Sequence, residues 1–260
     1  MTVVLVHGNP ETPVVWDLFA RRLAEAGIGA PVRLSPPGFG APVPERFDPT
    51  PTAYRDWLIA ELERFDGPVD LVGHDWGGLH VAGVAMRRPD LLRSWASDAL
   101  GVLDPGYRWH DLARLWQTPH AGEAWVEEQL RQDPKRRSEM YVAGGIDPRV
   151  AAPMAEGFDS DMGRCILRLY RAAAQPAMAE LGEGLPAAAA RPGLGILATE
   201  DTTVGTDEQR NASIRRAGAT PQPLPGAGHW WMTEEDGRPG ADALIGFWDS
   251  LAADGRGRAG

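Results

Sequence analysis

The sequence is poor in the residues that mark several common kinds of site. It has one cysteine, Cys165, and one lysine, Lys135, in 260 residues. A lone cysteine excludes an intramolecular disulfide and a cysteine-based metal site, so we expect Cys165 to be a small buried hydrophobic side chain. The 36 acidic residues outnumber the 26 basic ones, the net charge is −10, and no basic stripe is present. This balance argues against nucleic acid and against an anionic membrane as partners.

Long hydrophobic runs are also missing. The apolar residues 2–6 have no basic leader and are far shorter than a signal-peptide core, and no run approaches the length of a membrane span. We therefore expect a cytoplasmic protein. The richness in Ala, Gly, Pro and Arg is typical of a GC-rich genome and suggests a bacterial source.

The Gly-x-Ser-x-Gly motif of serine hydrolases is absent, but an acidic residue stands in an equivalent setting. A β-branched run ends at Gly73, Asp75 follows, Gly77 comes two residues later, and a helical pattern begins at once and is stopped by Pro89. This is the spacing of a nucleophile elbow, where flanking glycines avoid collisions between strand and helix. Such a turn would present Asp75 at a helix N-terminus, which favours a carboxylate. The competing interpretation is that Asp75 only caps the helix.

Strand-like and helix-like segments alternate along the chain. Strands are expected at 2–6, 31–35, 69–72, 94–97, 193–198 and, as a proline-containing edge strand, 219–224; helices are expected at 14–26, 52–65 (capped by Thr52), 79–86, 207–217 and 241–251. This alternation predicts a parallel sheet covered by helices on both faces. Residues 100–190 show an irregular helical pattern and predict an insertion. We therefore expect a core of residues 1–99 and 191–252 and a disordered tail at 253–260.

Polar residues follow the predicted strands, where ligands of parallel sheets bind. In chain order, Asp75, Asp201 and His229 have the sequence nucleophile, acid, histidine that is typical of the α/β-hydrolase fold. A histidine held by a carboxylate can act as a general base, and with an aspartate nucleophile it would activate water. Glu200 and Asp98 are the alternatives for the acid.

With these residues the chain resembles α/β-hydrolases of the epoxide-hydrolase and haloalkane-dehalogenase group. The His7-Gly-Asn9-Pro10 segment resembles the group's oxyanion turn, and Gly73-His-Asp-Trp-Gly-Gly78 resembles its elbow with an aspartate nucleophile. The resemblance implies a core with a helical cap and a hydrolysis in two steps that needs no cofactor or metal. Asp75 would form an alkyl-enzyme ester, His229 would activate water, and the backbone N–H groups of Asn9 and Trp76 would hold the oxyanion.

The cap would decide which bond is broken. The Arg168-Leu-Tyr170-Arg171 segment resembles the one that carries a proton-donating tyrosine in epoxide hydrolases, and Trp116-Gln117-Thr-Pro119 resembles the segment that follows a second tyrosine. The chain departs from the pattern at that second position, which is Leu112. Tyr170 would therefore act alone, or a neighbour would supply the second hydrogen bond, with three candidates: His110, Trp109 and Tyr107.

The resemblance leaves a second reaction open. Asn9 and Trp76 match the Asn and Trp that hold the halide in one branch of haloalkane dehalogenases, whereas Tyr170 and the Gly77-Gly78 pair favour epoxide opening. Epoxide hydrolysis is the preferred hypothesis, and a hydrolase fold reused as a ligand-binding protein is a third. The substrate is expected to be a small hydrophobic molecule that reacts with water in a pocket formed by His7, Pro10, Trp109, His110, Trp116, Gln117 and Trp230.

The amino-terminal end departs from the family as well. Members usually have two strands before the His-Gly turn, but here that turn begins at residue 7. We therefore expect a sheet of about six strands that lacks the first two. A partner, for example a second copy in a homodimer, could cover the edge that this leaves.

Overall fold

The computed structural model describes residues 1–257, with side chains described up to residue 253. Its centre is one six-stranded sheet in which every neighbouring pair of strands is parallel, in the order β2-β1-β3-β4-β5-β6. The strands are β1 (Val3–Val6), β2 (Val32–Leu34), β3 (Val69–Gly73), β4 (Leu92–Ser97), β5 (Gly193–Ala198) and β6 (Thr220–Leu224). The predicted α/β-hydrolase architecture with a parallel six-stranded sheet is confirmed.

The apolar content of each strand explains its place in the sheet. All residues of β1, β3 and β5 are buried, which fits central strands that are covered on both faces. β2 and β6 are largely exposed and form the two edges, and the prolines of β6, Pro221 and Pro223, are tolerated there because an edge strand leaves one side unpaired.

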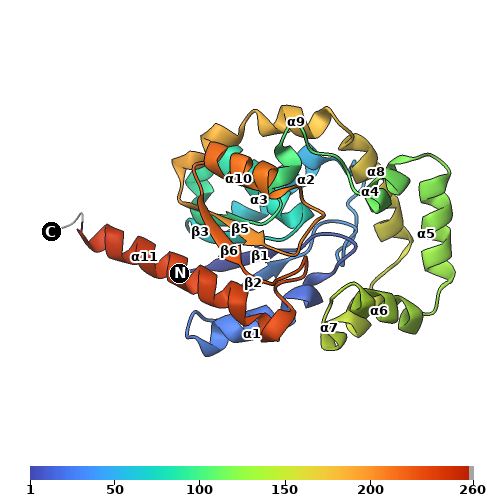
Figure 1. Cartoon of the computed structure of the whole chain (residues 1–260), viewed down its shortest axis with the longest axis horizontal. Coiled ribbons are helices and arrows are strands. Elements are labelled where there is room, and N and C mark those ends of the chain that lie inside the picture. Colours follow the sequence, from blue (N-terminus) through green and yellow to red (C-terminus); the bar gives the residue numbers. More distant parts are fainter. Residues whose placement is uncertain (258–260) are drawn as a thin grey trace.

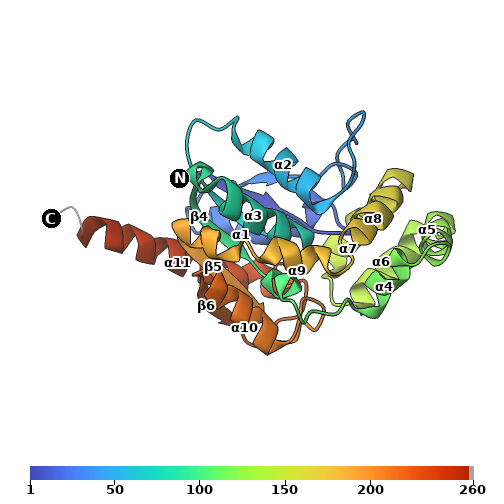
Figure 2. The same cartoon turned by 90° about the horizontal axis from the view of Figure 1, so that it is seen from above.

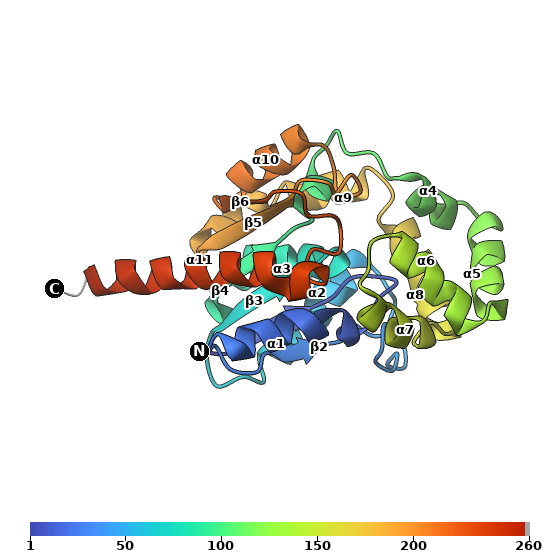
Figure 3. The ribbon, with the colours of Figure 1, turned by 60° about the horizontal axis from the view of Figure 1, so that its bottom comes forward.

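Helices cover both faces of the sheet (Figures 1 and 3). On one face α2 (Pro51–Leu62) packs against α3 (Trp76–Arg87), and α10 (Asp207–Arg216) contributes Ile214 to the same hydrophobic cluster. On the other face α1 (Asp17–Glu25), preceded by the 3-10 turn η1 (Pro13–Trp16), packs against α11 (Arg238–Gly257). Two buried clusters result, one on each face of the sheet.

Five helices form a layer beyond the carboxyl ends of the strands, seen at the right of Figures 1 and 3. They are α4 (Asp111–Gln117), α5 (Ala121–Arg131), α6 (Pro134–Ala143), α7 (Pro148–Glu156) and α8 (Ser160–Ala172). The single lysine, Lys135, is exposed in α6. α8 turns its apolar side inward and its arginines outward, and a bidentate pair from Arg168 to Asp48 links it to the core, with both N–O distances at 2.6 Å.

The last part of the predicted insertion lies against the core. α9 (Ala177–Gly182) contacts the 3-10 turn η3 (Leu100–Leu103), and η4 (Leu185–Ala190) packs on α3 (Figure 2). Two further 3-10 turns are η2 (Pro89–Leu91) and η5 (Glu234–Gly237). The division of the chain into core and cap stays a prediction.

Two local predictions are wrong. The cap of α2 is Thr50, whose hydroxyl accepts a hydrogen bond from the N–H of Ala53 at 3.2 Å, and Thr52 lies inside the helix. Pro51 stands at the first helical position, where a missing N–H costs nothing. Residues 253–257, predicted to be disordered, continue α11, and 258–260 lie outside the described residues.

Among the described residues, no helix is both long enough and apolar enough to cross a bilayer.

Candidate active site

Asp75 lies at the corner between β3 and α3 in a backbone conformation that non-glycine residues rarely adopt, with φ +51° and ψ −122°. The corner is tight: a Cβ on Gly77 would lie 2.1 Å from the carbonyl oxygen of Val6, and one on Gly73 would lie 2.4 Å from the carbonyl oxygen of Gly77. The Asp75 side chain makes no capping hydrogen bond. The capping interpretation is therefore wrong, and the strained turn instead presents the carboxylate to the space above the sheet.

The Asp75 carboxylate is half-buried and receives the backbone N–H of Asn9, with an N–Oδ1 distance of 3.1 Å. Burial raises the pKa of Asp75 to about 6, although the positive charges of His229 and His74 and the backbone N–H of Trp76 oppose the rise. Asn9 follows β1 and Trp76 begins α3, so two loops supply backbone donors to one carboxylate.

His229 lies in the loop after β6 and faces Asp201, which follows β5. Its Nδ1 lies 2.8 Å from Asp201 Oδ2, and the other oxygen of Asp201 accepts the N–H and the hydroxyl of Thr203 at 2.7 and 2.6 Å. Burial lowers the pKa of His229, but the Asp201 carboxylate outweighs it and the net shift is upward. The imidazole is thus fixed with Nδ1 toward the acid and Nε2 free for chemistry.

The two alternative acids have other positions. Glu200 is exposed, and Asp98 lies on the far side of the elbow, where its Oδ2 accepts from His74 Nδ1 at 2.6 Å. Among the three carboxylates that the sequence left open, Asp201 is the one that touches His229.

A second carboxylate–imidazole network lies beneath Asp75, and the sequence analysis missed it. His74 is fully buried between Asp98 and Glu11, whose Oε1 lies 3.0 Å from His74 Nε2. Although burial lowers the pKa of His74, the two carboxylates raise it well above its usual value, and the pKa of Glu11 falls to about 2 because the attraction of His74 exceeds the effect of burial. The three groups therefore form a buried triad in which a charged His74 pairs with an ionised Glu11.

This triad connects the loops that carry the site. Asp98 Oδ1 accepts the backbone N–H of Asp75 at 2.9 Å, and Glu11 accepts the N–H of Gly8 at 3.0 Å. The indoles of Trp230 and Trp231, next to His229, donate to Glu11 and Asp98 at 2.8 and 2.7 Å. One network thus fixes the turn of Asp75, the turn of Gly8 and the loop of His229.

Glu11, His74 and His229 are also the group with metal-ligand chemistry, because their ligand atoms lie within 4.8 Å of one another. Both nitrogens of His74 already bond to carboxylates, and Nδ1 of His229 bonds to Asp201. A metal ion at this position would have to displace the Glu11–His74 bond.

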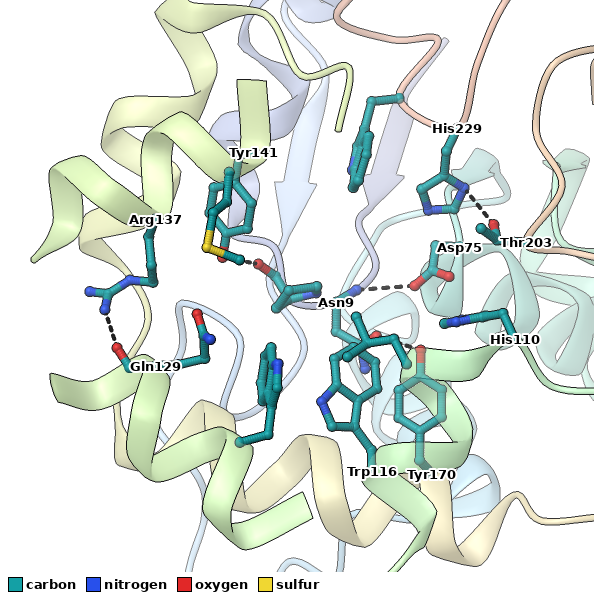
Figure 4. A pocket seen from close by; sticks show the side chains of 15 residues that line it. Asn9, Asp75, His110, Trp116, Gln129, Arg137, Tyr141, Tyr170, Thr203 and His229 are labelled. Carbon is teal, nitrogen blue, oxygen red and sulfur yellow. Dashed lines mark hydrogen bonds between the residues drawn. The ribbon is translucent and has the colours of Figure 1, made fainter. Parts of the chain in front are cut away.

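A cavity of about 260 Å³ lies between Asp75 and the cap helices (Figure 4). Of the predicted pocket residues, Pro10, His110, Trp116 and Trp230 line it.

Three other predicted pocket residues do not line the cavity, so these predictions are wrong. His7 Nδ1 bonds to the carbonyl of Gly8, and Gln117 donates to the carbonyl of Tyr170. Trp109 stacks on Trp76, and its Nε1–H donates to the carbonyl of Ala173. The residues that sequence reasoning missed are Trp125, Gln129, Arg137, Met140 and Tyr141, from α5 and α6, and Thr203.

Tyr170 reaches the cavity from α8. Its side chain is 2% exposed and its hydroxyl lies 3.4 Å from Asn9 Oδ1. Burial, followed by the charge of Asp75, raises the Tyr170 pKa well above its usual value, so this hydroxyl keeps its proton. Leu112, at the position where the family pattern has a second tyrosine, lines the same cavity.

The three candidates for a second donor differ in how their N–H and O–H groups are used. Tyr107 donates its hydroxyl to the carbonyl of Thr203 at 2.7 Å, and Trp109 donates to Ala173. His110 lines the cavity, and its Nδ1 accepts the backbone N–H of Ala113 at 3.3 Å. In a neutral imidazole the hydrogen must then be on Nε2, and burial lowers the His110 pKa, which favours this neutral form. Figure 4 shows the ring of His110 directed toward Asp75.

Comparisons with known proteins agree with this fold. The family model of the alpha/beta hydrolase family matches residues 3–243. Lipase LipV of Mycobacterium tuberculosis is 35% identical over 104 residues, which are 40% of this chain and 36% of that protein, so the match spans about a third of the curated relative.

Solved structures are similar over nearly the whole chain at low identity. The haloalkane dehalogenase DbeA from Bradyrhizobium elkanii is 22% identical with a TM-score of 0.66, and the match covers 96% of this chain and 91% of that one. A Pseudomonas aeruginosa protein assigned as an epoxide hydrolase is 17% identical with a TM-score of 0.71, over 96% and 88% of the two chains. An N-formylmaleamic acid deformylase from Pseudomonas putida S16 is 16% identical with a TM-score of 0.74, over 94% and 91%. These likenesses concern the fold, and together with the family match they show that the chain is a member of the alpha/beta hydrolase family.

Proposed function

We propose that this hydrolase opens epoxides to diols through a covalent ester on Asp75. The observation that carries the proposal is the position of Tyr170 and His110, which line one cavity with Asp75. Tyr170 can give a proton to a leaving oxygen, and the Nε2–H of neutral His110 can donate a hydrogen bond to it. An alkoxide is a poor leaving group and needs such a donor. The similarity to a protein assigned as an epoxide hydrolase supports the choice.

In the first step a carboxylate oxygen of Asp75 attacks one ring carbon, and the bond between this carbon and the ring oxygen breaks. The ring oxygen takes the proton of Tyr170 while the Nε2–H of His110 donates a hydrogen bond to it, which gives a hydroxyalkyl ester of Asp75. The ester carbonyl oxygen then lies near the N–H of Asn9, which already contacts Asp75 Oδ1 at 3.1 Å.

In the second step His229 removes a proton from water, and the hydroxide adds to the carbonyl carbon of the ester. The N–H groups of Asn9 and Trp76 stabilise the oxyanion that forms. When this intermediate collapses, the bond between the carbonyl carbon and the product oxygen breaks, and the added hydroxyl gives its proton to that oxygen. The diol leaves and Asp75 is restored as a carboxylate with one oxygen from water, while the proton held by His229 replaces the one that Tyr170 gave. The net reaction is epoxide plus water to diol.

The test traps the ester. We expect His229→Gln, incubated with styrene oxide, to gain the full mass of the substrate in intact-protein mass spectrometry, because the ester forms but cannot be hydrolysed. Asp75→Asn in the same background should show no adduct, and Glu200→Gln, an exposed carboxylate beside the acid, should behave as wild type. In ¹⁸O water the first diol released by wild type should carry unlabelled oxygen from Asp75. A first-turnover diol labelled by solvent would contradict covalent catalysis.

The proton donors can be tested in the same cavity. We expect Tyr170→Phe to lower kcat for epoxides by about 100-fold, since a positioned acid contributes roughly that much. Tyr141→Phe makes the same change on the far side of the cavity and should have little effect. Equal losses in the two variants would contradict a role of Tyr170 in proton donation.

One observation favours haloalkane hydrolysis as a second candidate. The side-chain Nδ2 of Asn9 is buried and has no hydrogen-bond partner among the described residues, so a donor is available for a departing halide. In that case His229→Gln would gain the substrate mass minus that of the hydrogen halide when it is incubated with 1-bromohexane. Asn9→Ala should reduce halide release at least tenfold but spare epoxide opening, because the backbone N–H remains.

A further inference from the structure

The cavity has two chemically different ends. In Figure 4 Asp75, His229 and His110 lie at one end and Gln129, Arg137 and Tyr141 at the other, with Asn9 and Trp116 between them. The reaction proposed above uses the first end. The second is built by α5 and α6 and has no part in bond breaking.

Gln129 carries an unused polar group at this second end. Its side chain is 5% exposed, it lines the cavity, and Figure 4 shows its amide turned toward the cavity interior. The side-chain amide has no hydrogen-bond partner within the described part of the chain; the bond drawn in Figure 4 goes to its backbone oxygen. The amide therefore faces the cavity with its hydrogen-bonding capacity unused by the protein, which points to a polar ligand group at this place in an otherwise aromatic wall.

Arg137 holds the backbone of Gln129 in place. Its guanidinium donates to the carbonyl oxygens of Gln129, of Gln132 at 3.0 Å and of Ala155 at 3.1 Å, and lies 5.5 Å from the ring centroid of Phe158. These carbonyls belong to the last turns of α5 and α7, where helix dipoles favour a cation. These bonds fix the backbone from which the Gln129 side chain enters the cavity.

The positive charge of Arg137, next to Gln129, decides which kind of ligand group would bind there. Arg137 is 5% exposed, and no described carboxylate lies within 4.0 Å of its guanidinium nitrogens. A buried positive charge without an opposite charge favours an oxygen that accepts a hydrogen bond over a donor.

We propose that Gln129 forms a subsite for a carbonyl or carboxylate oxygen at the remote end of an elongated substrate. The molecule would then be bifunctional, with its electrophilic carbon at Asp75 and its oxygen acceptor at Gln129, and aromatic walls around the chain that joins them. The statement about the electrophilic end rests on the proposed function, whereas the subsite itself can be tested without any reaction.

The binding test uses probes that have no electrophile. We expect hexanamide to bind wild type and to bind Gln129→Leu at least tenfold more weakly, as measured by calorimetry. Gln132→Leu is the matched control, since its carbonyl contacts the same guanidinium but its side chain does not line the cavity; it should bind as wild type does. Hexanoate distinguishes the two sources of oxygen, because tighter binding of hexanoate than of hexanamide assigns the subsite to an acid. Unchanged hexanamide binding in Gln129→Leu, or an equal loss in Gln132→Leu, would overturn the proposal.

A kinetic test compares substrates that can occupy one end or both ends of the cavity. Wild type should prefer an ω-epoxy amide to the epoxyalkane of equal length by at least tenfold in kcat/KM, and Gln129→Leu should lose that preference but keep turnover of the epoxyalkane. Absence of any diol, with hexanamide binding intact, would refute the proposed reaction and leave the subsite. Diol formation from both substrates at equal rates by wild type would refute the subsite.

Discussion

At the scale of single residues, the decisive side chain is Asp75, and its surroundings oppose its charge. Burial raises its pKa to about 6, so the fold holds a carboxylate that would be more stable in water. Partial desolvation and backbone strain at one side chain are a common compromise between stability and activity.

This compromise predicts the effect of Asp75→Asn on stability. The folded-state pKa lies above the usual value of 3.8, so the native state binds more protons between these pH values and ionisation of Asp75 destabilises it as pH rises through about 6. At pH 7.5 the Asp75→Asn protein should have a free energy of unfolding up to about 3 kcal/mol higher than wild type, because a pKa shift of about two units corresponds to that free energy. At pH 3.5, where both forms are neutral, the gain should disappear. Thermal unfolding of both proteins at the two pH values measures this, and an equal gain at both would show that charge is not its cause.

The sequence predicted the identities of the residues in the centre of the site, but not the directions of all side chains. Asp75, Asp201 and His229 follow β3, β5 and β6, and the carboxyl ends of parallel strands lie at the same edge of the sheet. His110, Trp109 and Tyr107 could not be separated in the same way, because three neighbouring residues before a helix point in directions that only the local hydrogen bonds decide.

At the scale of elements, the site depends on the contact between α3 and β1. α3 starts so close to β1 that only a glycine fits at position 77, where a Cβ would lie 2.1 Å from the backbone oxygen of Val6. The atoms that the Cβ would meet belong to the backbone of Val6 and His7, so a change of side-chain rotamer cannot relieve the clash.

We therefore expect Gly77→Ala to lower the free energy of unfolding by at least about 3 kcal/mol, the upper part of the range for overpacking. Gly246→Ala is the matched control. Gly246 is exposed within α11 with nothing within 4 Å of an added Cβ, so the change should stabilise by about 0.5–1 kcal/mol through helix propensity. Urea unfolding of both variants measures the difference. A Gly77→Ala protein as stable as wild type would show that the corner can open.

The elements of the sheet and its covering helices could be predicted from the sequence, and the bounds of α4 to α8 could not. The strands are short, apolar and bounded by turn residues, so their pattern is strong and also places the helices between them. The helices α4 to α8 are amphipathic pieces that contact one another and the rim of the core, and their buried faces depend on neighbours that are distant in sequence. For this reason the pocket residues of α5 and α6, Gln129 among them, gave no signal in the sequence.

At the scale of the whole molecule, one buried network joins loops that follow β1, β3, β4 and β6. Glu11, His74 and Asp98 come from three of these loops, and the indoles beside His229 complete the connection. The bond between Trp230 and Glu11 joins residues 219 positions apart, and no motif spacing relates the members of the network. A network of this kind emerges only when the sheet brings the carboxyl ends of its strands together.

The place of Lys135 in α6 has a practical consequence. It is the one lysine of the sequence, it is exposed, and α6 is the helix that supplies Met140 and Tyr141 to the cavity wall. An amine-reactive dye would label Lys135 and the exposed α-amino group of Met1. Trp230 lines the same cavity from the loop after β6, so it would quench a dye on Lys135 by an amount that depends on their separation. The chain therefore carries one side-chain amine from which a change in the separation of α6 and Trp230 could be followed without engineered cysteines.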